Sequence, residues 1–191
     1  PETQKPYVDP VKLRWFSHAT FRRAVAHAID KESIINIVMN GLAAPQFTTM
    51  SPSSGYFYHP DVRRYPYDVK KAKALLKEIG IEDRNDDGRV EDADGNPIEF
   101  NLLTNSGNTV RIEIAKIIAS DLKRLGFTVN FVPLAFNQLV SKFHATYDWD
   151  AIILGFTGGI EPHFGKNVWH SSGQLHVWNP AQEIPHTEWE K

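Results

Sequence analysis

Three short apolar stretches alternate with two amphipathic ones in the second half of the chain, and this alternation constrains the fold most. Residues 98–104, 127–134 and 149–155 are rich in β-branched and aromatic side chains and predict strands. The third contains an Ala-Ile-Ile-Leu run, which predicts burial on both faces. Between them, 108–125 and 136–145 carry apolar residues at helical spacing. The sequence therefore predicts an α/β fold with a parallel or mixed sheet flanked by helices.

The first half of the chain predicts further helices separated by one long loop. Apolar residues recur at helical spacing through 18–40, where Asp30 divides two helices as the N-cap of the second. Asp68 caps another helix, which runs to Gly80. The stretch between them, 41–66, is rich in proline, glycine and aromatic residues. It predicts a long extended loop of the kind that carries function or lies across a surface.

The composition is that of one ordinary globular domain, residues 1–191, and it excludes several classes of function. Hydrophobic residues make up 41% and charged residues 23%, with a net charge of −2. No basic run accompanies the aromatic residues, so no nucleic-acid partner is expected. The apolar stretches are far shorter than the roughly 18 residues that a membrane span needs. Because cysteine is absent, disulfides, thiolate metal sites and cysteine nucleophiles are excluded.

The segment that leaves the third predicted strand is the candidate ligand site. Open α/β sheets bind ligands beyond the carboxyl ends of their strands. This segment combines glycines, which expose backbone N–H groups, with aromatic faces and amide groups that suit peptides or sugars. The alternative is a tight glycine turn with buried aromatics. The candidate ligand-binding residues are Gly155, Phe156, Thr157, Gly158, Gly159, Glu161, Phe164, Asn167 and Trp169.

A polar loop at 83–94 follows the spacing of a calcium-binding loop. Oxygen-bearing side chains alternate around Gly88, as a hard cation requires, and Arg89 would contribute its backbone carbonyl. The last position is Asp instead of the longer Glu, and a strand follows instead of a helix. An acidic turn that links a helix to a strand is therefore the alternative. The candidate ligands of a structural calcium ion are Asp83, Asn85, Asp87, Arg89, Glu91 and Asp94.

No set of catalytic residues stands out, and no cofactor is required. His163, His170 and His176 lie close together in the sequence, but no His-x-x-x-His pair supports a zinc site. The Gly-x-Ser-x-Gly elbow and the phosphate-binding Gly-x-x-x-x-Gly-Lys motif are both absent. Glu161 and Asp150 could form a glycosidase pair only at a suitable separation in space. The sequence favours a binding protein over a hydrolase fragment.

Motifs from about residue 13 to residue 180 resemble, in order, the second lobe of family 5 extracellular solute-binding proteins. These proteins are the oligopeptide, dipeptide and nickel receptors of ABC importers. The resemblance rests on the helix 21–31, on Tyr67-Asp68 with the following 72–76, and on 147–155 with 169–172. The acidic loop ahead of a strand is also common in that family.

The resemblance implies a type II periplasmic-binding-protein fold, in which two lobes close on a ligand by hinge motion. The chain would be the second lobe, with the first lobe and the final return segments outside it. It would act at the periplasmic or extracellular face of the membrane without inserting there. Its partners would be an oligopeptide, or alternatively an oligosaccharide, and the permease of an ABC importer.

One departure from the family concerns the ligand's amino group. In peptide-binding members the segment matching 155–162 carries an Asp that pairs with this group, whereas here the only acid is Glu161, a few residues later. A buried ammonium without a carboxylate partner would cost several kcal/mol. Either Glu161 takes the role of the Asp, or the ligand lacks that charge.

Overall fold

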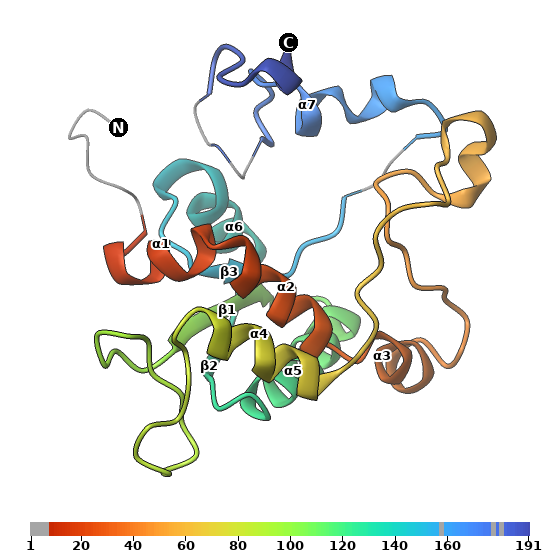
Figure 1. Ribbon diagram of the computed structural model, residues 1–191. Helices are drawn as coiled ribbons and strands as arrows, with labels where there is room; N and C mark the ends of the chain where they lie inside the picture. The colour runs from red at the N-terminus through yellow and green to blue at the C-terminus, as the bar shows by residue number, and fades with distance from the viewer. Residues whose placement is uncertain (1–7, 157–158, 177–178, 180–181) are drawn as a thin grey trace.

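The computed structural model describes residues 8–156, 159–176, 179 and 182–191, and its centre is a parallel sheet (Figure 1). The strand order is β2-β1-β3. β1 pairs with β2 along its whole length and with the short β3 on its other side. The strands are β1 Glu99–Asn105, β2 Thr128–Leu134 and β3 Ala151–Ile152. The prediction of an α/β fold is confirmed, and the strands in the described residues are all parallel.

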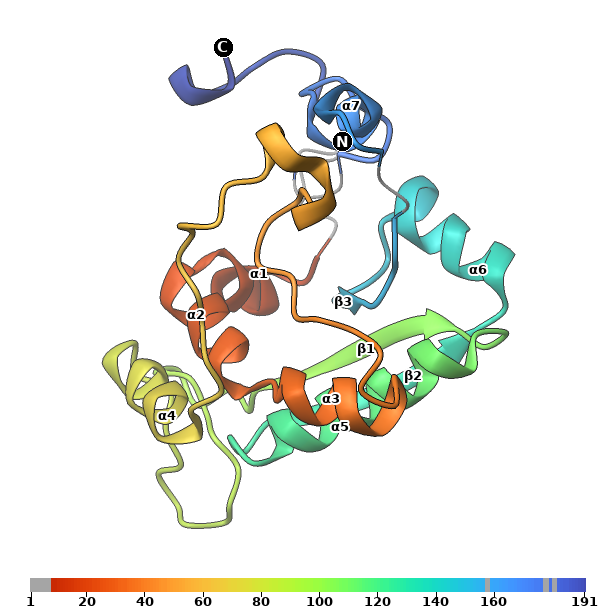
Figure 2. The same cartoon turned by 90° about the vertical axis from the view of Figure 1, so that its right-hand side faces the viewer.

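Helices surround this sheet, and α5 packs directly on β1 and β2 (Figure 2). The α-helices are α1 Pro10–Ser17, α2 Ala19–Ala28, α3 Lys31–Val38, α4 Val69–Glu78, α5 Thr109–Lys123, α6 Phe136–Ser141 and α7 Lys166–Trp169. Shorter helical turns are η1 Pro52–Phe57, η2 Lys142–Thr146, η3 Pro162–Gly165 and η4 Glu188–Glu190. Among the described residues, no helix is long and apolar enough to cross a membrane.

Side-chain caps set where the predicted helices begin. Asp30, Asp68 and Asn108 each accept a hydrogen bond from the N–H of the third residue of the following helix, at 3.0, 2.9 and 2.9 Å. Each cap satisfies one N–H group that has no partner within its own helix. One helix, α1, was not predicted; it begins at Pro10 after a similar cap by Asp9.

An aromatic cluster forms the centre of the core. The Phe21 ring of α2 stacks on Phe127 with centroids 5.6 Å apart, and Phe16 meets Phe100 edge-on at 5.4 Å. Burial of such a ring contributes about 1.5–3 kcal/mol to stability. The contact between α2 and α4 is lined by alanines without exposed surface, which lets the two helices approach closely: Ala24, Ala28 and Ala72.

A buried carboxylate, Asp92, ties the acidic loop to α1. It accepts hydrogen bonds from the indole N–H of Trp15 at 2.9 Å and from the backbone N–H groups of Asp94 and Asn96 at 3.0 and 2.9 Å. Burial alone would raise the pKa of Asp92, but these hydrogen bonds stabilise its charged form and hold the pKa below its ordinary value. The fold therefore favours the charged form of Asp92, and protonation of this side chain would weaken the link between the loop and α1.

The long loop between α3 and α4 is bound to His27 of α2 where it returns to the core. Nδ1 of His27 lies 2.7 Å from the carbonyl oxygen of Pro66, and the Asp68 N–H donates to the His27 carbonyl at 2.8 Å. The Tyr65 ring packs edge-on against the His27 ring at 5.4 Å. Between α3 and these anchors the loop extends away from the core, forms η1, and lies beside the segment that leads to α7 (Figure 1).

Two elements of the second half are shorter than the sequence predicts. β3 covers two residues instead of 149–155, and residues 151–154 are half-buried instead of buried on both faces. β3 is short because it pairs with β1 at only two positions, whereas β2, the other edge strand, pairs with β1 at seven. The predicted helix 136–145 divides into α6 and the wider turn η2, after which Tyr147 adopts a left-handed φ of 54°.

Candidate ligand-binding cavity

A cavity of about 610 Å³ lies between the long loop and the segment that follows β3. Figure 1 shows the orange turn of the long loop beside the light-blue segment that leads to α7, in the part of the view opposite α4 and the acidic loop. One wall consists of Gln46, Thr49, Met50, Ser51, Ser53 and Ser54. The other consists of Phe156, Gly159, Ile160, Glu161, Phe164, Gly165, Asn167, Val168, Trp169 and Leu175.

Most of the predicted ligand-binding residues meet in this cavity. Phe156, Gly159, Glu161, Phe164, Asn167 and Trp169 line it. Gly155 lies just outside the lining, and Thr157 and Gly158 lie outside the described residues. The structure thus gathers residues predicted from sequence alone, and their contact with a ligand stays a prediction.

Two aromatic side chains of the cavity, Phe164 and Trp169, pack against glycines. A Cβ added to Gly159 would lie 2.3 Å from Cδ2 of Phe164, and one added to Gly165 would lie 2.6 Å from Cδ1 of Trp169. Each ring therefore rests directly on glycine backbone. The exposed fractions are nevertheless 48% for Phe156, 70% for Phe164 and 50% for Trp169. The alternative of a glycine turn over buried aromatics is wrong, because large parts of these rings face solvent.

The polar groups of the cavity are mostly neutral. Among its described lining residues Glu161 is the only ionisable one, and it lies on the surface ahead of η3. The side-chain oxygen of Asn167 accepts from the Gln174 N–H at 2.8 Å, which leaves the amide NH₂ to meet a ligand. Ser51 and Ser53 hydrogen-bond to each other on the opposite wall. The cavity offers hydroxyl and amide groups, aromatic faces and a single negative charge.

Two parts of this site escaped the sequence analysis. The first is the wall from 46 to 54, which has no periodicity that would place it near residues a hundred positions later. The second lies beside the cavity lining and not in it: Arg111 donates to the Asn105 side chain at 2.8 Å, and its Nη2 would lie 3.1 Å from a Cβ at Gly155. Its position in the first turn after a strand was the available signal, because such turns face the ligand edge of an α/β sheet.

The acidic loop is folded by its own hydrogen bonds. Oδ2 of Asp83 accepts from the Gly88 N–H at 2.8 Å, and Oδ1 of Asp87 accepts from the Arg89 N–H at 2.7 Å. Asn85 likewise accepts from the N–H of Asp87 at 3.0 Å. These are the short-range bonds expected of an Asx-rich turn.

Two further acids of the loop also have partners: the Arg14 side chain for Asp94 and the backbone N–H of Arg84 for Glu91. Asp94 pairs with Arg14 at 2.5 Å, and Glu91 accepts from the Arg84 N–H at 3.4 Å. No group of three or more His, Asp or Glu side chains is arranged for metal binding in the part of the chain that is described. The calcium site stays a prediction, and the zinc reading of the histidines gains no support.

The carboxylates of the proposed hydrolase pair do not share a site. Asp150 forms an ion pair with Lys12 at 2.7 Å and accepts from the Asn101 N–H at 2.9 Å. It does not line the cavity, whereas Glu161 does. Asp150 therefore joins α1 to the sheet and has a structural role.

The fold is a parallel α/β sheet flanked by helices, with an aromatic-walled cavity formed in part by the segment that leaves β3. The family described as bacterial extracellular solute-binding proteins, family 5 Middle, matches residues 10–174. The chain belongs to this family, and the resemblance inferred from the motifs is confirmed.

Similar proteins extend well beyond the length of this chain. A probable ABC transporter-binding protein of Deinococcus radiodurans is 30% identical over 184 residues, which are 90% of this chain and 31% of that protein. The oligopeptide-binding protein AppA of Bacillus subtilis is 34% identical over 173 residues, 87% of this chain and 32% of AppA. The structure of AppA in complex with a nonapeptide has a TM-score of 0.79 at 33% identity, covering 88% of this chain and 34% of AppA. The chain thus spans about a third of these relatives.

Proposed function

We propose that this chain is the second lobe of the substrate-binding component of an ABC importer and captures oligopeptides in a cleft between two lobes. The observation that carries this proposal is the open cavity of about 610 Å³ between the long loop and the segment that leaves β3. The protein acts on the outer face of the cell membrane, holds its ligand without converting it, and delivers it to a permease. A first lobe and the return segments, outside this chain, supply the opposing wall.

The chemistry of the cavity supports a peptide that enters with its amino group toward Glu161. An ammonium group that loses water needs a carboxylate partner, and Glu161 is the one ionisable residue in the described lining. The exposed faces of Phe164 and Trp169 suit apolar side chains. Because this lobe provides one side of the contacts, the isolated lobe is expected to bind more weakly than the whole protein.

An oligosaccharide is the second candidate ligand, and the neutral lining favours it. Sugar rings stack their apolar faces on aromatic side chains and exchange hydrogen bonds with hydroxyl and amide groups. Phe164, Trp169, Ser51 and Asn167 provide both kinds of contact around the cavity.

Substitution of Glu161 separates the two ligand classes. Calorimetric titration of the full-length protein would compare peptides with free amino groups, the same peptides acetylated at the amino group, and neutral oligosaccharides. A hydrogen bond to a charged group contributes about 1.5–3 kcal/mol, so Glu161→Gln is expected to weaken binding of free-amine peptides roughly tenfold or more. Acetylated peptides should bind Glu161→Gln and the unsubstituted protein equally.

Controls for this experiment come from the same chain. Glu183→Gln removes an exposed carboxylate outside the cavity and should leave every affinity unchanged. Phe164→Ala removes an exposed ring and should weaken peptide or saccharide binding without lowering the melting temperature. Binding of oligosaccharides alone would replace the peptide assignment, and conversion of any ligand to product would contradict the receptor role.

A further inference from the structure

The part of the long loop that lines the candidate ligand-binding cavity, residues 46–54, has no hydrogen bond to the rest of the described chain. We refer to it as the loop wall. The backbone hydrogen bonds of residues 43–64 stay inside the loop, as do the side-chain hydrogen bonds of Gln46, Thr48 and Ser51. No strand pairing fixes this segment either. The position of the loop wall therefore depends on side-chain contacts of another kind.

Phe47 provides such contacts with two cations. The Lys31 ammonium lies over the Phe47 ring at 5.8 Å from its centroid, and the Arg64 guanidinium lies over it at 5.3 Å. A cation within about 6 Å of a ring centroid is attracted by the negative face of the ring. Among the described residues, neither Lys31 nor Arg64 forms an ion pair with a carboxylate. Both positive charges are thus free to interact with the ring.

Burial strengthens the contact with Lys31. This side chain is half-buried, and burial lowers the pKa of its ammonium from the ordinary value. Cation–π attraction increases as the cation loses water. One such contact changes an equilibrium constant by roughly two- to thirtyfold, from exposed sites to desolvated ones. Two contacts on one ring are therefore strong enough to decide where a loop without hydrogen bonds to its surroundings lies.

Both cations belong to well-anchored parts of the lobe. Lys31 is the first residue of α3, directly after Asp30, whose backbone N–H donates to the Asp121 carboxylate of α5 at 3.0 Å. Arg64 comes just before the residues that bind His27, where the loop returns beside α2 (Figure 2). The Phe47 ring therefore joins the outgoing arm of the loop both to α3 and to the bound end of the returning arm.

The position of Phe47 is passed on to the cavity by its neighbours in the chain. Phe47 does not line the cavity, whereas Gln46, Thr49 and Met50 do. The Gln46 side chain donates to the Thr48 carbonyl at 2.9 Å, and the Thr48 hydroxyl donates to the Met50 carbonyl. These bonds make residues 46–50 a compact unit, so a shift of the ring moves the lining residues with it.

We propose that Phe47, held by Lys31 and Arg64, is the positioning residue that sets the loop wall for ligand binding, an inference that rests on the proposed function. Without these contacts the wall moves among several positions, and only a fraction of the molecules has it in place. The apparent affinity falls by that fraction. The core keeps its stability, because none of the three side chains belongs to the hydrophobic cluster.

The first test measures the wall without any ligand. The chain has no cysteine, so spin labels can be placed through Tyr56→Cys on η1 and Lys166→Cys on α7, both exposed. In the full-length protein, the distribution of distances between the two labels should broaden in Phe47→Leu. Phe47→Tyr, which keeps the ring face, should restore the narrow distribution. The melting temperature should be the same in all three proteins.

The second test measures affinity by calorimetry of the full-length protein, with the tetrapeptide Ala-Phe-Ala-Phe and a neutral hexasaccharide as probes. Phe47→Leu should weaken binding at least threefold, and Phe47→Tyr should restore it. Lys31→Met with Arg64→Gln should weaken binding to the same extent, whereas Lys31→Arg with Arg64→Lys keeps both cations and should preserve it. Phe136→Leu removes an exposed ring outside the cavity and should have no effect.

An unchanged distance distribution in Phe47→Leu would overturn the proposal, as would equal broadening in Phe136→Leu. Failure of Phe47→Tyr to restore the distribution would assign the effect to packing and not to the ring face. If every Phe47 variant lowers the melting temperature, Lys31→Met with Arg64→Gln decides, since it keeps the ring; an unchanged distribution there refutes the proposal. Lack of binding by both probes would count against the proposed function, and the distance measurement would still decide the role of Phe47.

Discussion

Substitution of Gly126 by alanine tests how the α5–β2 turn is packed against the acidic loop. Gly126 has a φ of +93°, and a Cβ there would lie 3.0 Å from the Gly88 carbonyl oxygen and 3.0 Å from Cγ1 of Val90. The Val90 N–H also donates to the Gly126 carbonyl at 3.2 Å, so neither segment can move away without loss of that bond. Gly126→Ala therefore introduces both backbone strain and a steric conflict.

Gly41 provides a matched control, because it has a φ of +73° but nothing within 4 Å of an added Cβ. The left-handed conformation costs an L-residue about 1–2 kcal/mol, and overpacking costs a further 1–3 kcal/mol or so. We expect Gly41→Ala to lower the free energy of unfolding by about 1–2 kcal/mol and Gly126→Ala by about 2–5 kcal/mol. The entropy that alanine removes from the unfolded chain is similar at both positions and cancels in the comparison.

Urea unfolding followed by tryptophan fluorescence measures both variants. The dependence of unfolding free energy on urea should match the unsubstituted protein, so the transition midpoint carries the difference. Equal destabilisation by the two substitutions would refute the steric argument. That result would mean that the acidic loop shifts to accommodate the added methyl group and is not tightly packed against the turn.

Two further predictions concern the acidic loop. Asp92→Asn should lower the free energy of unfolding by about 2–3 kcal/mol at neutral pH, because neutral hydrogen bonds replace charge-assisted ones. Since the pKa of Asp92 is lowered in the folded state, its contribution is present above the unfolded pKa of about 3.9 and is lost as the pH falls through the folded pKa. Urea unfolding at several pH values should show that the free energy of unfolding falls less at acid pH in Asp92→Asn than in the unsubstituted protein. Calcium at about millimolar concentration should raise the melting temperature, and Asp83→Ala should abolish that rise; no rise in the unsubstituted protein would remove the calcium hypothesis.

The elements that the sequence predicted well are those with local signals. Asp30, Asp68 and Asn108 mark helix starts because a cap involves residues three positions apart. Gly80 and Gly126 mark helix ends because both adopt a positive φ. These interactions lie within one turn of chain, so a single sequence contains the information needed to place them.

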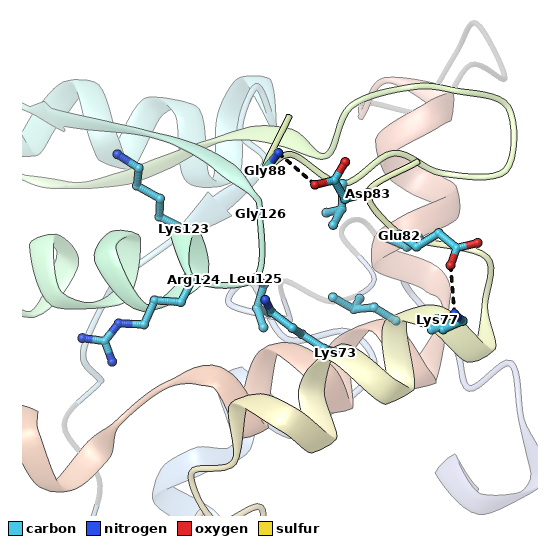
Figure 3. Close-up of a pocket in the computed structure, with 12 residues that line it drawn as sticks. Lys73, Lys77, Glu82, Asp83, Gly88, Lys123, Arg124, Leu125 and Gly126 are labelled. Carbon is cyan, nitrogen blue, oxygen red and sulfur yellow. Dashed lines mark hydrogen bonds and ion pairs between the residues drawn. The ribbon is translucent and has the colours of Figure 1, made fainter. Parts of the chain in front are cut away.

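The elements that it missed depend on distant contacts. β3 is short because it pairs with β1 at only two positions, and the Ala-Ile-Ile-Leu run does not encode the extent of that pairing. One wall of the candidate ligand-binding cavity was predicted because a glycine-rich segment follows a strand. The other wall, near Ser51 and Ser54, was not, because its place is set by the return of the long loop to α2. A smaller cavity enclosed by α4, the end of α5 and the acidic loop (Figure 3) likewise joins distant segments, and no spacing along the chain reveals it.

The hydrogen bonds between His27 and the end of the long loop allow the wall of the ligand-binding cavity to change without loss of core stability. Pro66 and Asp68 bind His27 whatever the length of chain that precedes them, so residues 42–64 can gain or lose segments while both attachment points stay in place. Each doubling of loop length costs only about 0.6 kcal/mol in closure entropy. Insertions and deletions in this wall are therefore an inexpensive route to new ligand sizes, for natural evolution and for protein engineers alike.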